Sequence, residues 1–436
     1  MLRRFSTFAL LAFFVLCLSG WTPVGTGLPK SPDWQFGHEV PLLGKGYLKW
    51  HPPDGGVNEL TENQKVINSW GYKARPVEEI KDLLPKFFYD RMNTPESYGD
   101  FRLNETEYLP MRGPAWELFQ AATEKYKGTC YLDEQGWLYN YKAGLPFPDL
   151  DVENDPQGVL KLIWNFYKRI QFDDRIGPFV GNIRDRRGNT RLVMSDNINF
   201  KFMGRLVLDP KPMYEPNPKQ IDFVYSLPYM EPYGMRGTIA LVHRYLIQKN
   251  DDMWMYLPSM RRVRRLATTQ TQDRLPGGID ATWDTIDGFM GRVVDFDFEY
   301  LGRKELLMPV VSGTYPQLDP DGMAGVDNYF QRRNCYVVRA KYKRPITMTE
   351  MTIWLDPETY YSCYMLSKDL KGNDWMTQVY FWGRTKDWWF SQSIMSMADI
   401  QRTHASRVFI SCYEVNNNFT PHDFSMERLI QKYGVR

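Results

Sequence analysis

The chain has two parts that differ in the spacing of their apolar residues. Between about residues 61 and 170, apolar side chains recur every three or four positions, which is typical of amphipathic helices. Helices are predicted at residues 113–128 and 155–170, each with a proline in its first turn. A capping-box pattern at Thr61 predicts another helix, and a further helical region is interrupted at Pro85. The first part of the chain is therefore expected to be helical.

From about residue 188 the spacing changes to two, which predicts strands. The strands are short and separated by turn residues, which favours a large antiparallel sheet, sandwich or barrel in an α+β fold. A turn is predicted at residues 195–197. Residues 209–236, rich in Pro, Tyr and Met, are predicted as a long loop that acts as a lid. Helical pieces are predicted at 394–404 and 424–433. The predicted strands span residues 188–194, 198–208, 237–248, 253–258, 261–269, 293–300, 334–342, 351–355, 359–366 and 376–384.

Residues 252–301 combine aromatic and basic positions most densely. An aromatic strand leads through a turn into four arginines, and a Pro-Gly-Gly loop follows. A later strand alternates three acids, Asp295, Asp297 and Glu299, with three aromatics, Phe296, Phe298 and Tyr300. Such alternation predicts one solvated face, so the acids are interpreted as surface residues. We interpret the whole stretch as the wall of a curved sheet with a basic seam.

The basic seam cannot present all four arginines on one side. Strand alternation places Arg262 and Arg264 on one face and Arg261 and Arg265 on the other. Two interpretations stay open: surface residues that form ion pairs, or a local patch that docks an anion or a partner protein.

The N-terminus predicts export. Arg3 and Arg4 precede an apolar run of eleven residues with small residues after it, which is typical of a cleaved signal peptide at 1–19. A Pro- and Gly-rich extended arm is expected at 20–60, followed by a single domain at 61–436.

The charge balance excludes a protein held to nucleic acid by bulk charge. The chain has 54 basic and 52 acidic residues, and removal of the two leader arginines leaves 52 against 52. A neutral mature chain lacks the long-range attraction to phosphates that such binding needs. Any basic function must therefore be local.

Four cysteines remain after the leader. Cys130, Cys335, Cys363 and Cys412 are far apart and form no CxxC pair, so no zinc cluster is predicted. Cys335 and Cys363 lie in predicted strands, where they either form a disulfide in an exported chain or remain buried thiols.

No catalytic motif is present. The five histidines show no HExxH or HxH spacing, and the chain has no nucleophile elbow, phosphate-binding loop or dinucleotide fingerprint. Asp280, Asp284 and Asp287 would share one side of a short helix, as an acid–base or cation site or as capping and ion-pairing residues. No catalytic residue, no metal and no cofactor is predicted.

Several motifs resemble a known family. The run DMWMYLP at residues 252–258 followed by RRVRR at 261–265 resembles the exported bacterial proteins called domain of unknown function family 1329. The GLPFP run at 144–148, Ile-Trp-Asn at 163–165 and the glycines within 284–307 are similar to other segments of that family. The resemblance extends from about residue 60 to 410.

The resemblance implies a fold and a cellular context. It implies an incomplete β-barrel with helices on its concave side, like the lipoprotein carriers LolA and LolB, in the periplasm, with peripheral membrane contact possible. Members of that family tend to occur beside resistance-nodulation-division type transporters and outer-membrane barrel proteins, so the resemblance also implies partners of these two kinds. Carriers of this kind hold acyl chains or other apolar ligands.

The function predicted is a periplasmic carrier or adaptor for a hydrophobic molecule. The alternatives are an exported enzyme that acts on lipids or aromatic compounds, and a structural envelope protein that docks on an outer-membrane barrel. The candidate ligand-binding residues are Trp254, Tyr256, Leu257, Phe296, Phe298, Tyr300, Tyr225, Tyr229 and Met230. The candidate docking residues are Arg261, Arg262, Arg264 and Arg265.

Overall fold

The computed structural model describes most of the chain after the predicted arm. The described residues are 65–310, 328–384, 390–410 and 419–434, with short strands at 39–41, 47–49, 317–318, 325–326 and 414–415. The predicted signal peptide, most of the predicted arm and Cys412 lie outside them. Among the described helices, none has both the length and the hydropathy needed to cross a membrane.

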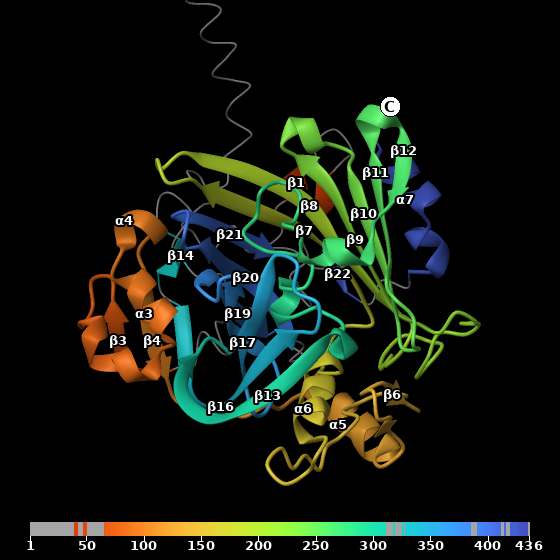
Figure 1. Ribbon diagram of the computed structural model, residues 1–436, viewed down its shortest axis with the longest axis horizontal. Helices are drawn as coiled ribbons and strands as arrows, with labels where there is room; N and C mark the ends of the chain where they lie inside the picture. The colour runs from red at the N-terminus through yellow and green to blue at the C-terminus, as the bar shows by residue number, and fades with distance from the viewer. Residues whose placement is uncertain are drawn as a thin grey trace, which may run out of the picture.

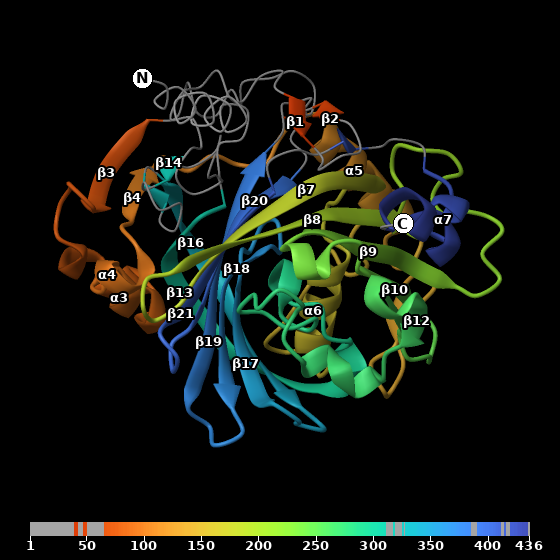
Figure 2. The same cartoon turned by 90° about the horizontal axis from the view of Figure 1, so that it is seen from above.

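A single curved sheet of sixteen strands dominates the molecule (Figures 1 and 2). Its main path runs β12-β11-β10-β9-β8-β7-β21-β20-β19-β18-β17-β16, with β13 beyond β16, and these neighbours pair antiparallel. Because β12 and β13 do not pair, the sheet is an incomplete barrel, and the α+β prediction is confirmed. The main strands are β7 (Asp174–Arg184), β8 (Thr190–Lys201), β9 (Ile221–Glu231), β10 (Ile239–Tyr245), β11 (Asp252–Leu257), β12 (Arg262–Arg265), β13 (Phe296–Met308), β16 (Asn328–Tyr342), β17 (Met348–Leu355), β18 (Ser362–Asp369), β19 (Asp374–Arg384), β20 (Phe390–Asp399) and β21 (His404–Ile410).

Shorter elements attach to this sheet. β4 pairs parallel with the start of β16, and β3 pairs with β4. The remaining strands are β1 (Glu39–Pro41), β2 (Tyr47–Lys49), β3 (Val66–Gly71), β4 (Arg102–Thr106), β5 (Tyr131–Leu132), β6 (Leu138–Tyr139), β14 (Gln317–Leu318), β15 (Gly325–Val326) and β22 (Glu414–Val415). The α-helices are α3 (Lys86–Met92), α4 (Pro95–Tyr98), α5 (Pro114–Tyr126), α6 (Gly158–Tyr167) and α7 (Met426–Tyr433). The 3-10 helices are η3 (Val77–Leu83), η4 (Tyr233–Met235), η5 (Pro258–Met260), η6 (Thr268–Gln272), η7 (Ile286–Gly288), η8 (Val293–Asp295) and η9 (Pro421–Phe424).

The prediction for the first part of the chain is partly confirmed. The helices predicted at 113–128 and 155–170 are α5 and α6, and the helical region interrupted at Pro85 is η3 followed by α3. The helix predicted from Thr61 is wrong, because Val66–Gly71 is a strand that gains a pairing partner in β4. Tertiary pairing outweighs the local capping signal there.

Two predictions of irregular structure, a turn and a lid, are wrong because both regions contain strands. The predicted turn at 195–197 lies in the middle of β8, which is one continuous strand. Ser195 and Asp196 are fully buried, and their side chains bond to Pro228 O at 2.9 Å and to the Tyr433 hydroxyl at 2.7 Å. Neighbouring elements therefore satisfy polar groups that would otherwise favour a turn. The predicted lid at 209–236 is also wrong, because β9 occupies its second half.

Of the two helices predicted in the C-terminal region, one is confirmed and the other is wrong. The piece predicted at 424–433 is α7. The piece predicted at 394–404 is instead the end of β20 and the turn after it, where pairing on both sides of β20 fixes an extended backbone.

Different elements cover the two faces of the sheet. α6 and residues 267–292, here called the inner segment, lie on the concave side, here called the inner face (Figure 2). α3 and α4 lie against the opposite, outer face near β19 and β21, and α7 covers the outer face near β10. Helix α6 confirms the expected helix on the concave side. Because both faces are covered, polar residues of these strands are not automatically solvent-facing.

Candidate functional site

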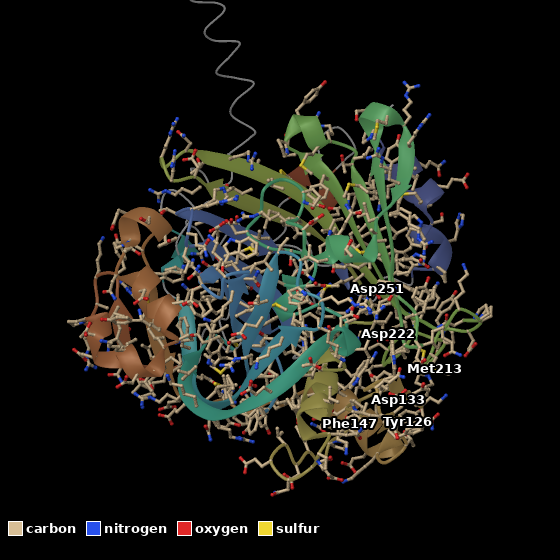
Figure 3. The ribbon with its side chains drawn as sticks, viewed as in Figure 1. Tyr126, Asp133, Phe147, Met213, Asp222 and Asp251 are labelled. Carbon is tan, nitrogen blue, oxygen red and sulfur yellow. The ribbon has the colours of Figure 1, made fainter. Side chains whose placement is uncertain are left out.

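The inner face holds two adjacent cavities. The first, of about 50 Å³, lies where the end of α6 meets β7, β8 and β9 beneath the inner segment. In Figure 3, Asp222 marks the β9 side of this region and Asp251 lies near it at the same end of the sheet. The first cavity is lined by Tyr141, Tyr167, Lys168, Arg169, Gln171, Arg175, Asn199, Lys201, Met203, Asp222, Phe223, Tyr225, Asp287, Phe289 and Met290.

Strand register explains why polar side chains meet there. In β8, Ile198 and Phe200 point to the outer face, where they join the apolar cluster beneath α7. Asn199 and Lys201 therefore point inward. Asn199 lies opposite Arg175 on β7 and opposite Tyr225 on β9, so these side chains share the inner face.

Two of the cations in the first cavity are paired with carboxylates. Lys168 donates to both oxygens of Asp222 at 2.6 Å, and Arg169 reaches Asp287 at 3.1 Å. The Arg169 guanidinium also lies 4.6 Å from the centre of the Tyr361 ring. Burial lowers the pKa of Lys168, but the carboxylate partner opposes that change. Both pairs are largely withdrawn from water and need their partners to remain charged.

Lys201 is placed differently. Its ammonium donates to the carbonyl of Gln171 at 3.1 Å, and no carboxylate of a described residue lies within ion-pair distance of it. Burial lowers the pKa of Lys201 to about 8, so the side chain is still mostly protonated at neutral pH. The cavity therefore has a cation with unused donor capacity in its wall.

The second cavity, of about 20 Å³, is mostly apolar. Arg175, Tyr225 and Asp287 line both cavities, so the two are adjacent. The second lies between the inner segment and strands β7, β9, β20 and β21. Its lining is Arg175, Phe179, Asn197, Tyr225, Leu227, Leu275, Ile279, Ala281, Ile286, Asp287, Met395, Met397 and Val408.

The inner segment is held by side-chain hydrogen bonds and apolar packing. Asp284 is buried and accepts from the Tyr342 hydroxyl at 2.8 Å and from Thr271 at 3.0 Å. Burial raises the pKa of Asp284 to about 6, and the hydrogen bonds only partly oppose it. The Gln272 side chain accepts from the backbone N–H groups of residues 346 and 347. Between its 3-10 turns the segment has no helix or strand.

The prediction that Asp280, Asp284 and Asp287 share a helix face is wrong. Only Ile286–Gly288 is helical, as a single 3-10 turn, because each acid is drawn toward a different element. The partners are Ser406 on β21 at 2.6 Å for Asp280, Tyr342 on β16 at 2.8 Å for Asp284, and Arg169 after α6 at 3.1 Å for Asp287. Asp280 also pairs with Arg274 at 2.9 Å, so the alternative of ion-pairing residues is confirmed for Asp280 and Asp287. The three acids therefore anchor the inner segment at three places.

The candidate ligand residues divide between the two faces. Trp254 and Tyr256 pack in the outer cluster beneath α7, whereas Tyr225 and Tyr229 lie in the inner cluster. Tyr225 lines both cavities, and the other eight candidates line neither. Leu257 ends β11, and Met230 is buried on β9. The ring of Phe289 lies 5.0 Å from that of Phe296 and 6.0 Å from that of Phe298. The rings of Tyr300 and Tyr336 are 6.3 Å apart.

The acids that alternate with the last three aromatics are solvated, as predicted. Asp297 and Glu299 are exposed on β13, and Glu299 lies 3.0 Å from both Arg339 and Lys341. Asp295 ends the 3-10 turn that precedes the strand.

The arginines form an exposed edge. All four are exposed, and β12 is the last strand of the sheet. Arg262 and Arg264 share one face, as predicted. Arg265 lies on the other face, where it pairs with Asp252. Arg261 lies in the turn before the strand with a left-handed backbone, so its predicted place in the strand is wrong.

The described cysteines are free. Cys335 and Cys363 are buried thiols, so of the two interpretations the disulfide is wrong. Burial raises the pKa of the Cys335 thiol to about 12, which makes it unreactive while the protein is folded. Within the described residues no three His, Cys, Asp or Glu side chains are grouped to hold a metal ion.

Sequence reasoning missed the lysines and arginines of the first cavity. The signal was present in the alternation of Asn197, Asn199 and Lys201 with Ile198 and Phe200. That pattern ordinarily indicates a solvated polar face. Here the apolar members point to α7 and the polar members point inward, which only the position of the helix reveals.

Comparison with known proteins identifies a matching family. The family model described as "Protein of unknown function (DUF1329)" matches residues 73–428. No curated protein matches the sequence.

Solved structures with a similar chain path include three bacterial proteins. A Vibrio parahaemolyticus domain described as an outer membrane lipoprotein-sorting protein has 15% identity and a TM-score of 0.47, covering 63% of this chain and 99% of that one. A DUF1329 family protein from Desulfovibrio piger has 15% identity and a TM-score of 0.47, covering 62% and 96%. A LolA superfamily protein from Nitrosomonas europaea has 13% identity and a TM-score of 0.38, covering 59% and 93%.

Proposed function

This chain belongs to the DUF1329 family of proteins of unknown function, and we propose that it is a periplasmic carrier for a hydrophobic molecule. The molecule would lie between the inner face of the incomplete barrel and the inner segment. The sequence pattern of a cleaved signal peptide supports the periplasmic location. In this proposal the protein binds and hands over its cargo without chemical change.

The observation that carries the proposal is the pair of adjacent cavities beneath the inner segment. Ligand sites are usually concave and mostly apolar, with a few polar groups that orient the ligand. The second cavity supplies the apolar wall and the first supplies the polar groups. Methionines Met395 and Met397 in that wall adapt to ligands of irregular shape.

The cavities are smaller than a lipid, so the inner segment must move for a ligand to enter. They measure about 50 and 20 Å³, whereas pockets for drug-sized ligands span about 300–1,000 Å³. Each methylene buried contributes about 0.8 kcal/mol, so a sixteen-carbon chain supplies up to about 13 kcal/mol. The contacts of that chain would replace the apolar packing of the segment and its hydrogen bonds, which contribute about 1 kcal/mol net each.

A partner in the envelope completes the proposal. A carrier must receive and release its cargo, and the motifs resemble proteins associated with resistance-nodulation-division type transporters and outer-membrane barrels. We propose that the exposed edge formed by Arg262 and Arg264 contacts such a partner. The edge lies away from the cavities, so docking and cargo binding are separable.

Lipid extraction tests the carrier function directly. Protein purified from the periplasm would be analysed by native mass spectrometry, then extracted with organic solvent and the extract identified. A bound amphiphile or lipid at near one per chain is the expected result. Protein that is empty as isolated and remains empty after incubation with lipids, sterols and hydrophobic aromatics would contradict the proposal.

A reversible lock tests entry beneath the inner segment. A Cβ built on Gly277 lies 3.1 Å from a methyl carbon of Val193 on β8. Because a Val193 methyl carbon is one bond from its Cβ, Gly277→Cys with Val193→Cys brings the two Cβ atoms near the separation of about 3.5–4.5 Å that a disulfide requires. The φ of Gly277 is +87°, so Gly277→Cys also strains the backbone, and the single Gly277→Cys variant measures that effect. The oxidised variant should take up a fluorescent fatty acid at least tenfold more slowly than the same protein after reduction. The two single variants serve as controls, and equal uptake by both redox forms would show that ligand enters elsewhere.

A further inference from the structure

We propose that the cargo is an amphiphile with an anionic head, a carboxylate or a phosphate, and that Lys201 receives the head while the tail lies in the second cavity. The inference rests on the proposed carrier function and adds the class of ligand.

The charges around the first cavity favour an anion. Four cationic side chains and two carboxylates line it, an excess of two positive charges. Both carboxylates already have cationic partners: Asp222 pairs with Lys168, and Asp287 pairs with Arg169. Lys201 on β8 belongs to neither pair, and among the described residues the charge of Asp173 acts on it without forming an ion pair.

Lys201 has the donors that an anionic head would need. An ammonium has three N–H donors, and the bond to the Gln171 carbonyl at 3.1 Å uses one. Its side chain and that of Asn199 project from the same face of β8 into the cavity, so an amide lies beside the cation. A head group there would receive hydrogen bonds from both side chains.

The junction of the cavities fixes the direction of the tail. Tyr225 and Arg175 line both cavities, so the two adjoin along the inner face of β7 and β9. Beyond the junction the wall is formed by Phe179, Leu227 and Ile279, which suits a hydrocarbon chain. A neutral lipid would fill the apolar side equally well but would give the spare donors of the Lys201 ammonium no charged acceptor, which is unfavourable in a partly dry site.

The test compares two ligands that differ only in the head with a second anionic amphiphile and with a free anion. Delipidated full-length protein would be titrated with oleate, oleyl alcohol, dodecyl phosphate and inorganic phosphate by isothermal titration calorimetry at constant salt. Oleate should bind about 10- to 100-fold more tightly than oleyl alcohol, as expected for a charge-assisted hydrogen bond. Dodecyl phosphate should also bind, and inorganic phosphate should bind at least 100-fold more weakly than dodecyl phosphate.

Variants assign the preference to Lys201. Lys201→Gln should abolish the preference for oleate over oleyl alcohol, and Lys201→Arg should retain it. Lys368→Gln, at a lysine that pairs with Asp374 on the surface, is the matched control and should bind like the wild type. Melting curves identify any variant that fails to fold, in which case the wild-type comparison of oleate with oleyl alcohol decides.

The possible failures are distinguishable. Equal affinity for oleate and oleyl alcohol would overturn the anionic head while leaving the carrier function intact. Inorganic phosphate binding as tightly as dodecyl phosphate would indicate a free-anion site and overturn the amphiphile. Absence of binding by every amphiphile would overturn the carrier function itself.

Discussion

Asp284 should make the stability of this protein depend on pH in a way that one substitution removes. Its carboxyl group is buried within the inner segment, and burial raises its pKa from 3.8 to about 6. The folded protein thus holds this proton more tightly than the unfolded chain does. The stabilisation is complete below about pH 4 and is lost as the pH rises through about 6.

The size of the effect follows from the two pKa values. The difference between 3.8 and about 6 corresponds to about 3 kcal/mol, of which about 2 kcal/mol falls between pH 4.5 and 7.5. Asp284→Asn has no such titration. Its amide oxygen can still accept from Thr271 and Tyr342, while its N–H₂ group would cost about 1 kcal/mol if it found no partner. The variant should therefore be about 2 kcal/mol more stable than the wild type at pH 7.5.

Urea denaturation at several pH values between 4.5 and 7.5 measures this difference. Other acids titrate in the same range, so the informative quantity is the wild-type value minus the variant value at each pH. Asp297→Asn, at an exposed position on β13, is the control and should leave the difference near zero. If the Asp284→Asn curve runs parallel to that of the wild type, the raised pKa is not responsible and the reasoning is refuted.

Three further outcomes are expected. Replacing both Arg262 and Arg264 by Glu should leave stability and ligand content unchanged, because both side chains are exposed, but should abolish pull-down of an envelope partner; loss of ligand would instead place the edge in the binding site. Cys335 and Cys363 should resist a thiol reagent in the native protein and react after unfolding, since both are buried, and rapid native labelling would contradict that burial. Phe88→Ala should lower the free energy of unfolding by about 3–5 kcal/mol, because Phe88 is fully buried between α3 and the sheet, and a loss below 1 kcal/mol would show that this contact is loose.

Local sequence patterns predict those helices and strands whose tertiary contacts leave the local conformational preference unchanged. α5 and α6 have prolines near their starts and an apolar face, and both form as expected. The centre of β8 was not predictable in this way. Ser195 and Asp196 favour turns in isolation, and they become strand residues only because β9 and α7 supply their hydrogen bonds.

The site was harder to predict than the fold for a related reason. Period-two alternation shows which side chains share a face, but it does not show which face is inside. Aromatic residues suit ligand walls, so the sequence predicts Trp254 and Tyr256 in such a wall, whereas both pack in the outer apolar cluster that includes residues of α7. Lys201 faces the cavity although a lysine in an alternating strand usually faces water.

The polar inner face is the strongest argument that this sheet holds a ligand and not simply a core. A core of the same volume would be more stable with apolar residues, because a buried charge is unfavourable unless it is paired. The Lys168–Asp222 and Arg169–Asp287 pairs reduce that penalty, whereas Lys201 retains a lowered pKa in a cavity wall. An anionic ligand would add a counter-charge to that of Asp173 and raise the pKa of Lys201. The same event would exchange the present packing of the inner segment for contacts with the ligand, so ligand binding and opening of the segment would be linked.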